Sequence, residues 1–505
     1  MLPLFSPAAT AAGTPPPRPI PGSYGIPLLG PIRDRLDYFW FQGPDEFFRR
    51  RAAQHQSTVF RANIPPTFPF FLGVDPRVVA VVDSAAFTAL FDSSLVDKRD
   101  CLIGPYNPSD SFTGGTRVGV YLDTEEPEHA RTKAFAIDLL RRSSRVWASE
   151  FLAGVDGMLG AVESDLGAGK EGGGSFIVPL QQCIFQFLCK AVVGADTAAE
   201  DFVHRFGVYV LDVWLGLQLV PTQKIGAIPQ PLEELLFHSF PFPSILVKPG
   251  YDMLYRFVEK HGAEAVAVGV DDHGLPAKDA INNILFVLGF NAFGGFSVFL
   301  PFLILEIGKA DAAPLRTRLR DEVRRALVDD NGSEMAVGFA AVAKGRMPLV
   351  RSTVYEVLRT RPPVPLQFGR ARQDFVLRSH GGEGFAVFAG EMLCGYQPLA
   401  MRDPAVFERP EEFIADRFVG EEGEKLLRHV YWSNGPETEE ATVGNKQCAA
   451  KDAVIATACM LVAELFRRYD DFECDGTSFT KLEKRRPREP SQQSPFTSTS
   501  AASSK

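Results

Sequence analysis

The chain has 505 residues, of which 45% are hydrophobic, so it can bury a large core and wholesale disorder is excluded. Its net charge of -9 argues against a nucleic-acid-binding protein, which needs a basic face. The seven cysteines form no Cys-x-x-Cys pair and no framework spacing, which disfavours a disulfide scaffold and a structural zinc site. Length alone leaves the number of domains open.

Residues 1–31 are rich in Pro, Gly and Ala and are predicted to be extended and not helical. They contain no apolar run long enough to cross a bilayer and no basic region of a secretory signal. Beyond them, residues 45–54 have the pattern of a helix. Residues 58–61 and 68–72 have the pattern of strands around a turn at Pro65-Pro66.

In the rest of the chain, apolar residues recur at helical spacing over long stretches, such as 134–140, 202–219 and 280–303. The glycine-rich joint at residues 167–175 is predicted to be a surface loop. The tail at residues 487–505 is rich in Ser, Thr, Pro and Gln and is predicted to be disordered. The pattern therefore predicts a mainly α fold with small β-sheets, and it contains no internal repeat.

Residues 284–305 are almost wholly apolar and carry no charge, so they meet the length criterion for a membrane span. Asn291 lies in the middle of this stretch, glycines weaken it, and Pro301 interrupts it. Its flanks carry charges of both signs, so neither side has the positive excess of a cytoplasmic loop. We therefore predict a helix buried in a large soluble core. A membrane transport or binding protein is the alternative that this stretch leaves open.

Cys448 stands in a loop directly before a strongly periodic helix, in the run Asn445-Lys446-Gln447-Cys448-Ala449. Unpaired N–H groups and the positive end of the helix dipole are expected to lower the pKa of a thiol there. A thiolate is the form in which cysteine ligates haem iron. The alternative is a buried structural cysteine, which would be preferred if this were the only motif.

Glu356 and Arg359 lie one turn apart on one face of a predicted helix, a pair that is common by chance. Here the pair is followed by Arg409-Pro410-Glu411-Glu412-Phe413 with Asp416-Arg417-Phe418, and then by the cysteine loop. This order of motifs resembles the cytochrome P-450 superfamily over nearly the whole chain. The resemblance implies the cytochrome P-450 fold, a single compact haem domain, in which Glu356 and Arg359 are structural. The expected parts are a Pro/Gly-rich N-terminal segment (1–31), a haem-thiolate catalytic domain (32–486) and a disordered Ser-rich tail (487–505).

Two departures from the common superfamily pattern indicate one branch. Residues 436–444 form an insert before the cysteine motif, and the central helix reads Phe290-Asn291-Ala292-Phe293 where a monooxygenase usually carries an acid followed by Thr. Without an acid–hydroxyl pair, activation of dioxygen is poorly supported. Both features resemble the plant enzymes that metabolise fatty acid hydroperoxides: hydroperoxide lyases, allene oxide synthases and divinyl ether synthases. Their substrate already contains its oxygen atoms, so they need no dioxygen and no reductase.

The resemblance implies a set of residues that bind haem b. Cys448 is the expected ligand of the iron, and Lys446, two residues earlier, is expected to meet a haem propionate. His129 and Lys133 lie one turn apart on one helix face and are expected to meet propionates as well. Lys98 occupies the position of a further basic contact. For each of these charges the alternative is a solvated surface side chain.

Asn291 is the expected catalytic and substrate-binding residue on the distal side, where its amide would hydrogen-bond the hydroperoxide. The alternative is a core amide that bonds a neighbouring carbonyl. Allene oxide synthases tend to carry Phe at the position of Leu102, Ser at Val120 and often a basic residue at Ser297. These differences favour a lyase, because an apolar wall does not stabilise a developing cation. Leu102 and Val120 are therefore predicted to be catalytic, and Ser297 to bind substrate.

The resemblance thus predicts a fatty acid hydroperoxide lyase. It would cleave 13-hydroperoxides of linoleic and linolenic acid into six-carbon aldehydes and twelve-carbon oxo-acids. Allene oxide synthase or divinyl ether synthase activity on the same substrates is the alternative, and a reductase-coupled monooxygenase is a more distant one. The expected partner is the hydroperoxide substrate, with no nucleic acid and no reductase. Localisation in the plastid (chloroplast) follows from the family alone, and the apolar N-terminal segment predicts peripheral membrane contact.

Overall fold

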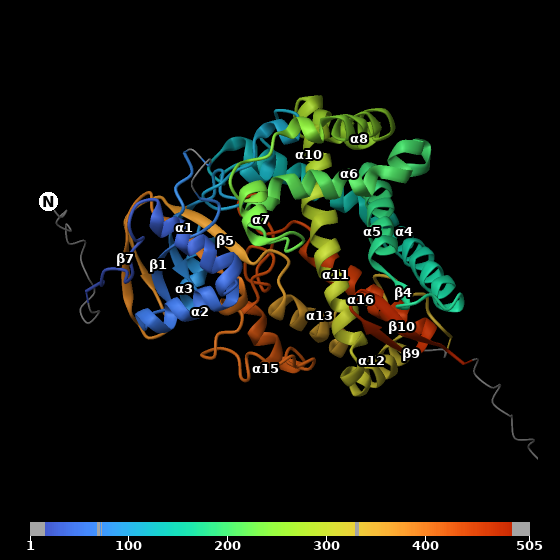
Figure 1. Cartoon of the computed structure of the whole chain (residues 1–505). Coiled ribbons are helices and arrows are strands. Elements are labelled where there is room, and N and C mark those ends of the chain that lie inside the picture. The colour runs from blue at the N-terminus through green and yellow to red at the C-terminus, as the bar shows by residue number, and fades with distance from the viewer. Residues whose placement is uncertain (1–15, 68–70, 72, 329–332, 487–505) are drawn as a thin grey trace, which may run out of the picture.

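Helices make up most of the structure, and small sheets lie on two sides of the helical body (Figure 1). The computed structural model describes residues 16–67, 71, 73–328 and 333–486. Its α-helices are α1 (Leu29–Leu36), α2 (Pro44–His55), α3 (Ser84–Phe87), α4 (Pro127–Gly167), α5 (Ile177–Leu188), α6 (Asp201–Leu219), α7 (Gln230–Phe237), α8 (Lys248–His261), α9 (Ala263–Ala267), α10 (Ala277–Phe286), α11 (Gly294–Gly308), α12 (Ala313–Ala326), α13 (Pro348–Thr360), α14 (Gln397–Ala400), α15 (Gly420–Lys425) and α16 (Lys451–Arg468).

The strands form three sheets. They are β1 (Val59–Asn63), β2 (Arg77–Val81), β3 (Val96–Asp97), β4 (Gly174–Ser175), β5 (Leu366–Ala371), β6 (Phe375–Arg378), β7 (Gly384–Val387), β8 (Met392–Tyr396), β9 (Tyr469–Asp475) and β10 (Ser478–Lys484). The largest sheet has the order β1-β2-β8-β5-β3, with β2 parallel to β8 and the other neighbours antiparallel. The second sheet has the order β4-β10-β9, and β6 pairs with β7. The largest sheet therefore joins the first hundred residues to strands that follow α13.

The local predictions near the N-terminus agree with the structure in part. The helix predicted at residues 45–54 is α2, and the strand predicted at 58–61 is β1. The partner of β1 is β2, which begins at Arg77, and not the segment predicted at 68–72. Of that segment, residues 68–70 and 72 lie outside the described residues, as does the tail 487–505. The joint predicted at 167–175 is a loop except for Gly167, which ends α4, and the last two residues, which form β4.

Residues 16–28 have little regular structure and pack along β7. The backbone N–H of Arg18 donates to the carbonyl of Gly384 at 2.9 Å, and the N–H of Ala386 donates back to the carbonyl of Arg18 at 3.1 Å. The extended segment ends earlier than predicted, because α1 begins at Leu29. A Cβ atom on Gly30 would lie 2.2 Å from the carbonyl oxygen of Tyr24, so only glycine lets α1 pack back on this segment.

The apolar stretch in the middle of the chain is a helix from Ala277 to Gly308, built from α10, the π-helical segment η10 (Val287–Phe293) and α11. By length and composition it could cross a membrane. It instead runs through the helical body, where α10 packs against α8 and α11 packs against α5, α13 and α16 (Figure 1). Pro301 does not end the helix, contrary to the predicted interruption, because packed helices hold the turns on both sides of it.

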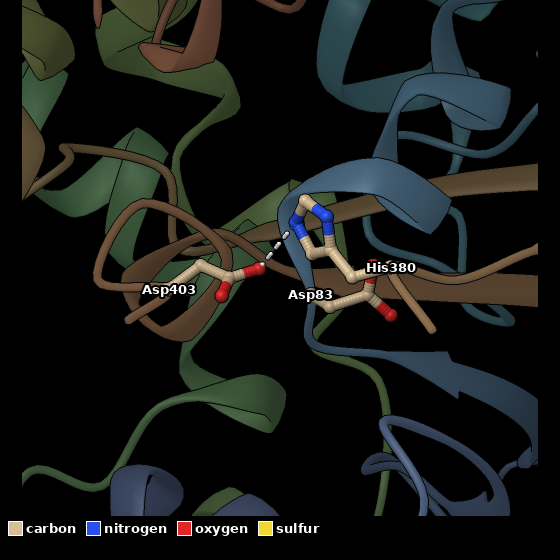
Figure 2. A group of neighbouring side chains, drawn as sticks. All are labelled: Asp83, His380 and Asp403. Carbon is tan, nitrogen blue, oxygen red and sulfur yellow. Dashed lines mark ion pairs between the residues drawn. The ribbon is translucent and has the colours of Figure 1, made fainter. Parts of the chain in front are cut away.

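Three titratable side chains join distant parts of the sheet region (Figure 2). Asp83 caps α3 by accepting the backbone N–H of Ala86 at 2.8 Å, and Asp403, in the loop after α14, accepts the N–H of Ser84 at 2.8 Å. His380, in the turn between β6 and β7, pairs with Asp403 at 2.9 Å. Because both buried carboxylates bond backbone donors, the cluster acts as a structural joint between α3, the β6–β7 hairpin and this loop.

Candidate haem-thiolate site

The loop that carries Cys448 is held by backbone bonds on both sides of the cysteine. The N–H of Cys448 donates to the carbonyl of Ser433 at 2.8 Å, and its carbonyl accepts the N–H of Lys451, the first residue of α16, at 3.2 Å. The side chain of Asn434 donates to the carbonyl of Lys446 at 2.9 Å. Cys448 remains only half-buried, whereas five of the other six cysteines are buried. The Cys448 residue therefore stays partly accessible just before α16.

The pKa of the Cys448 thiol differs from the sequence prediction. Burial raises this pKa above its ordinary value, while the backbone N–H of Ala450 and the charge of Lys133 act in the opposite direction. The expectation of a lowered pKa from the helix end alone was therefore wrong, because the desolvation of an interior sulfur outweighs the helix dipole. Coordination of a metal ion deprotonates a thiol outright, so a bound iron makes the thiolate that the helix end does not.

Four basic side chains from three parts of the fold gather near the cysteine loop: Lys98 after β3, His129 and Lys133 on α4, and Lys446 in the loop itself. Burial lowers the pKa of Lys446 to about 7, with help from the charges of Lys133 and Lys98. Burial lowers the pKa of His129 to about 4, and the charges of Lys446 and Lys133 lower it further. Burial also lowers the pKa of Lys98 to about 8 and that of Lys133. These groups lie close enough together to oppose one another's protonation.

None of these four side chains forms an ion pair with a carboxylate in the described part of the chain. The ammonium group of Lys446 donates instead to the carbonyls of Gly119, Val120 and Leu122, at 3.1, 3.1 and 2.8 Å. Lys98 donates to the carbonyl of Phe368 at 2.6 Å, and Lys133 donates to that of Gln447. The Nδ1 atom of His129 is buried without a partner among the described residues. A dianionic group such as a pair of haem propionates would supply the missing negative charge, so these residues fit a haem.

Asn291 lies in η10, in the middle of the buried central helix, and its side chain is nevertheless exposed. On the same helix face, a Cβ atom on Gly295 would meet nothing within 4 Å, and Val298 keeps 41% of its surface exposed. This face of a core helix therefore borders open space. The described residues supply no hydrogen bond to the Asn291 amide, so the alternative of an amide satisfied by a neighbouring carbonyl has no support. Departures from α-helical geometry are frequent at functional sites.

Leu102 and Val120 lie on neighbouring loops, and both side chains are half-buried. The loop of Val120 is tied to the central helix, because the N–H of Gly119 donates to the side chain of Asn283 at 3.0 Å. It is also tied to the cysteine loop through Lys446. It therefore lies between the helix that carries Asn291 and the loop that carries Cys448. The hydroxyl of Ser297 is placed differently, because its oxygen is buried and bonds no described residue.

Glu356 and Arg359 form a fully buried ion pair on α13, with separations of 2.7 and 2.8 Å. Arg359 also donates to three backbone carbonyls, those of Met401, Pro410 and Glu412. Sequence reasoning missed a third member, Arg417, whose Nε lies 3.1 Å from Glu356. The segment around Arg417 was part of the motif order in the sequence, but its distance along the chain from Glu356 gave no indication of contact.

A second missed residue is Glu437, in the insert at residues 436–444. Its carboxylate is buried, and burial raises its pKa. It accepts hydrogen bonds from the indole of Trp432 at 3.0 Å and from the hydroxyl of Tyr355 at 3.1 Å. The ammonium group of Lys451 donates to its backbone carbonyl at 3.2 Å. No pattern in the sequence separates Glu437 from the exposed acids that follow it, so only the fold could identify it.

A cysteine loop before a long helix, a cluster of basic side chains without carboxylate ion pairs among the described residues and an exposed face of the central helix fit a haem-thiolate protein of the cytochrome P-450 class. The cytochrome P-450 family model matches residues 313–436. Among solved structures, the cytochrome P-450DA haem domain has a TM-score of 0.64 at 14% identity, over 93% of this chain and 98% of that chain.

Curated relatives extend the match to nearly the whole chain. Linolenate hydroperoxide lyase of Arabidopsis thaliana is 52% identical over 92% of this chain and 93% of its own length. Fatty acid hydroperoxide lyase of Solanum lycopersicum is 47% identical over 95% of this chain and 99% of its own length. Allene oxide synthase of Arabidopsis thaliana is 43% identical over 91% of this chain and 86% of its own length. The chain belongs to the plant branch of the cytochrome P-450 family that contains hydroperoxide lyases and allene oxide synthases.

Proposed function

We propose that this protein is a fatty acid hydroperoxide lyase that cleaves 13-hydroperoxides of linoleic and linolenic acid. The products are a six-carbon aldehyde and a twelve-carbon oxo-acid. The observation that carries the proposal is the 52% identity to a linolenate hydroperoxide lyase, against 43% to an allene oxide synthase. The side chains at Leu102 and Val120 are apolar, which also favours a lyase over an allene oxide synthase.

The cofactor is haem b, held by Cys448 and by Lys98, His129, Lys133 and Lys446. When bound, it supplies an iron that cleaves the weak O–O bond of the substrate, assisted by electron density from the thiolate. The protein then determines what the substrate radical becomes. Rearrangement to a hemiacetal loses no atoms, and the hemiacetal divides into aldehyde and oxo-acid. Formation of an allene oxide removes one molecule of water. Neither route consumes dioxygen, reductase or nicotinamide.

The distal residues have separate tasks in this reaction. The Asn291 amide, on the open helix face, donates a hydrogen bond to the hydroperoxide and orients its O–O bond. Leu102 and Val120 form an apolar wall that offers no stabilisation to a developing cation, which favours rearrangement over loss of water. Ser297 contributes a hydroxyl near the same face of the substrate site. The catalytic unit comprises residues 32–486.

The test is an anaerobic incubation of purified, haem-loaded protein with 13-hydroperoxylinolenate, without nicotinamide or reductase, followed by separation of the products. We expect mainly six-carbon aldehyde and twelve-carbon oxo-acid. Mainly ketols, which form when an allene oxide reacts with water, would replace the lyase by an allene oxide synthase. Divinyl ethers would indicate the third activity of the branch. A need for dioxygen and reducing equivalents would indicate a monooxygenase.

The protein acts in the plastid, as the chloroplastic names of its relatives suggest, and at a membrane surface, where fatty acid derivatives reside. An apolar face supports the membrane proposal. Exposed Leu29 and Phe41 near α1 and exposed Leu232 and Leu235 on α7 belong to segments joined through Glu234. The Glu234 carboxylate pairs with Arg35 at 2.9 Å and accepts the indole N–H of Trp40 at 2.7 Å.

Flotation of the protein with vesicles of plastid-type galactolipids tests this association. Leu232→Ser with Leu235→Ser is expected to reduce the bound fraction at least threefold, because apolar burial contributes about 25 cal/mol per Å². Val376→Ser is the matched control, since Val376 is exposed on β6, which belongs to neither of these two segments. Equal binding of all variants would remove the apolar face as the contact.

A further inference from the structure

Leu102 and Val120, which select the product under the proposed function, lie on two short loops. Leu102 is in a turn after β3, and Val120 is in the 3₁₀ turn η4 (Gly119–Tyr121). Neither side chain has a polar atom that could fix its position. Their positions relative to one another therefore depend on the bonds that hold the two loops together.

The two loops meet at Asp100, two residues before Leu102. The backbone N–H of Asp100 donates to the carbonyl of Tyr121 at 3.1 Å, next to Val120. Asp100 has a φ of 50°, in the left-handed region that residues other than glycine rarely occupy. Such a conformation persists only where surrounding contacts hold it. The direction in which the chain enters Leu102 therefore depends on what binds Asp100.

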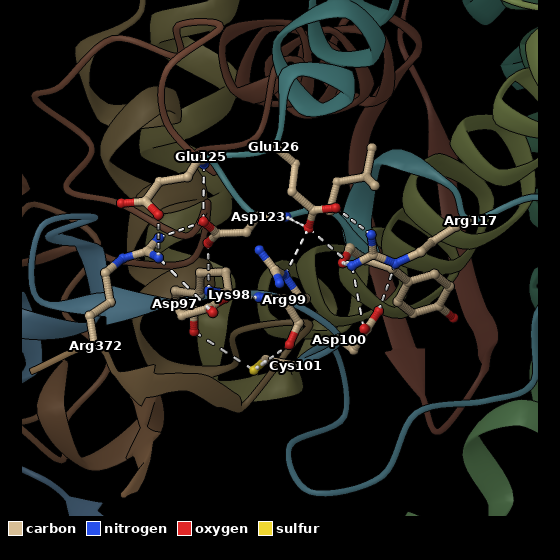
Figure 3. A network of polar contacts seen from close by, with 12 residues as sticks. Asp97, Lys98, Arg99, Asp100, Cys101, Arg117, Asp123, Glu125, Glu126 and Arg372 are labelled. Atoms are coloured by element: carbon tan, nitrogen blue, oxygen red, sulfur yellow. Dashed lines mark hydrogen bonds and ion pairs between the residues drawn. The ribbon is translucent and has the colours of Figure 1, made fainter. Parts of the chain in front are cut away.

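One guanidinium group closes this joint (Figure 3). Arg117 donates from Nη2 to the carbonyl of Tyr121 at 2.8 Å. It also pairs with both carboxylate oxygens of Asp100, at 3.2 and 3.3 Å. The third partner of Arg117 is Glu126, the residue before α4, to which both Nη1 and Nη2 donate. Arg117 thus connects the Leu102 loop, the Val120 loop and the start of the helix that carries His129.

The positive charge of Arg117 is paired with the carboxylates of Asp100 and Glu126. Hydrogen bonding to Arg117 is the main cause that lowers the pKa of Glu126 to about 2. Arg117 keeps 31% of its side chain exposed, so the network is partly shielded from water. On its other side the Val120 loop is held by Lys446, through the carbonyls of Gly119, Val120 and Leu122. Loss of Arg117 would leave this loop fixed to the cysteine loop but would weaken its connection to the Leu102 loop, where the backbone bond from Asp100 to Tyr121 remains.

We propose that Arg117 is a positioning residue for product selection, which holds Leu102 against Val120 through Asp100 and the Tyr121 carbonyl. This inference rests on the proposed function. The lyase route and the allene oxide route begin from the same hydroperoxide. They differ in whether the substrate rearranges to a hemiacetal or loses one molecule of water. Rearrangement to the hemiacetal requires the substrate radical to stay confined, so a wall that shifts favours loss of water and raises the yield of ketol.

Arg117→Gln tests the proposal, and Arg99→Gln is the matched control. Arg99 also pairs with Glu126, at 3.1 Å, but it is 51% exposed and the structure gives it no bond to Asp100 or Tyr121. The substrate is 13-hydroperoxylinolenate, and the readout is the ratio of aldehyde to ketol. We expect this ratio to fall at least fivefold in Arg117→Gln, to recover partly in Arg117→Lys and to stay unchanged in Arg99→Gln. Asp100→Ala, measured in the same way, should match Arg117→Gln.

Haem content and thermal midpoint are measured for each variant, so that a loss of folding is separated from a change of product. If Arg117→Gln does not fold, the Asp100→Ala ratio decides. A variant that folds and loses total activity at an unchanged ratio would overturn the positioning role and leave Arg117 as a purely structural residue. A wild-type protein that yields mainly ketol would instead overturn the proposed function, before any variant is compared.

Discussion

Tyr355 donates its phenolic hydrogen to the buried carboxylate of Glu437 at 3.1 Å, and this bond joins α13 to the insert that precedes the cysteine loop. Glu356 is the next residue of α13. The insert is therefore not a surface loop added to a finished site. Through Glu437 it connects α13 to the loop that holds Cys448.

Replacement of Glu437 by Gln is expected to destabilise the protein, although the two side chains have the same shape. The two carboxylate oxygens accept from two different donors, Tyr355 and Trp432, whereas Gln would direct an NH₂ group at one of them. One unsatisfied buried donor costs about 1–3 kcal/mol. Urea unfolding of the haem-loaded protein measures this cost. Glu439→Gln, an exposed acid of the same insert, is the control and should change stability little.

Replacement of Arg359 by Ala is expected to be more severe, because it leaves the buried Glu356 carboxylate with one charged partner and removes the donors to three carbonyls. Breaking a buried pair typically costs about 3–5 kcal/mol. We expect low yields of haem-containing protein, measured as the haem-to-protein ratio after purification. Arg361→Ala, half-exposed at the end of the same helix, serves for comparison. Equal haem contents in the two variants would contradict a structural role for Arg359.

Asn291→Ala is expected to reduce turnover without loss of haem. The side chain makes no bond to a described residue, so its removal should not destabilise the fold. Removal of one oriented donor from a reacting oxygen typically lowers the rate about 10²–10³-fold. Steady-state kinetics with 13-hydroperoxylinolenate and a thermal midpoint form the test. A large drop in the midpoint with full specific activity would make Asn291 structural.

Leu102→Phe is expected to move products from aldehyde toward allene oxide, because an aromatic ring stabilises the cation that precedes loss of water. The ratio of ketol to aldehyde should rise severalfold while consumption of hydroperoxide continues. Leu95→Phe, a partly buried residue just before β3, is the size-matched control. An unchanged product ratio in Leu102→Phe would count against the apolar-wall argument.

Stability is expected to rise from pH 4 to pH 6.5 because of His429. Burial, together with the charges of Arg428 and His380, lowers the pKa of His429 to about 4, and Asp403 opposes this shift. Between this value and the ordinary pKa of 6.5, the unfolded chain binds a proton that the folded protein does not, so stability falls as pH falls through this window. His429→Asn should reduce the difference in unfolding free energy between pH 7 and pH 5 by about 1 kcal/mol.

Much of the site was predictable because its signals are local or ordered along the chain. The cysteine before a periodic helix, the Glu-x-x-Arg pair and the long apolar stretch could each be located in the sequence, and α16, α13 and the central helix are where they were expected. Spacing alone placed His129 and Lys133 on one helix face. A side chain's neighbours within one turn depend only on helical geometry, which the residue pattern determines.

The tertiary structure decided everything that depends on burial and on contacts between distant segments. The sequence predicted a lowered pKa for Cys448, but the depth of the sulfur raises it. No sequence pattern singled out Arg117 or Glu437, and only the fold placed Arg117 between two loops and Glu437 against α13. The free energy of a charge depends on its surrounding dielectric and its partners, and neither is a property of local sequence. Local order came from the sequence, whereas the electrostatics of the site came from packing.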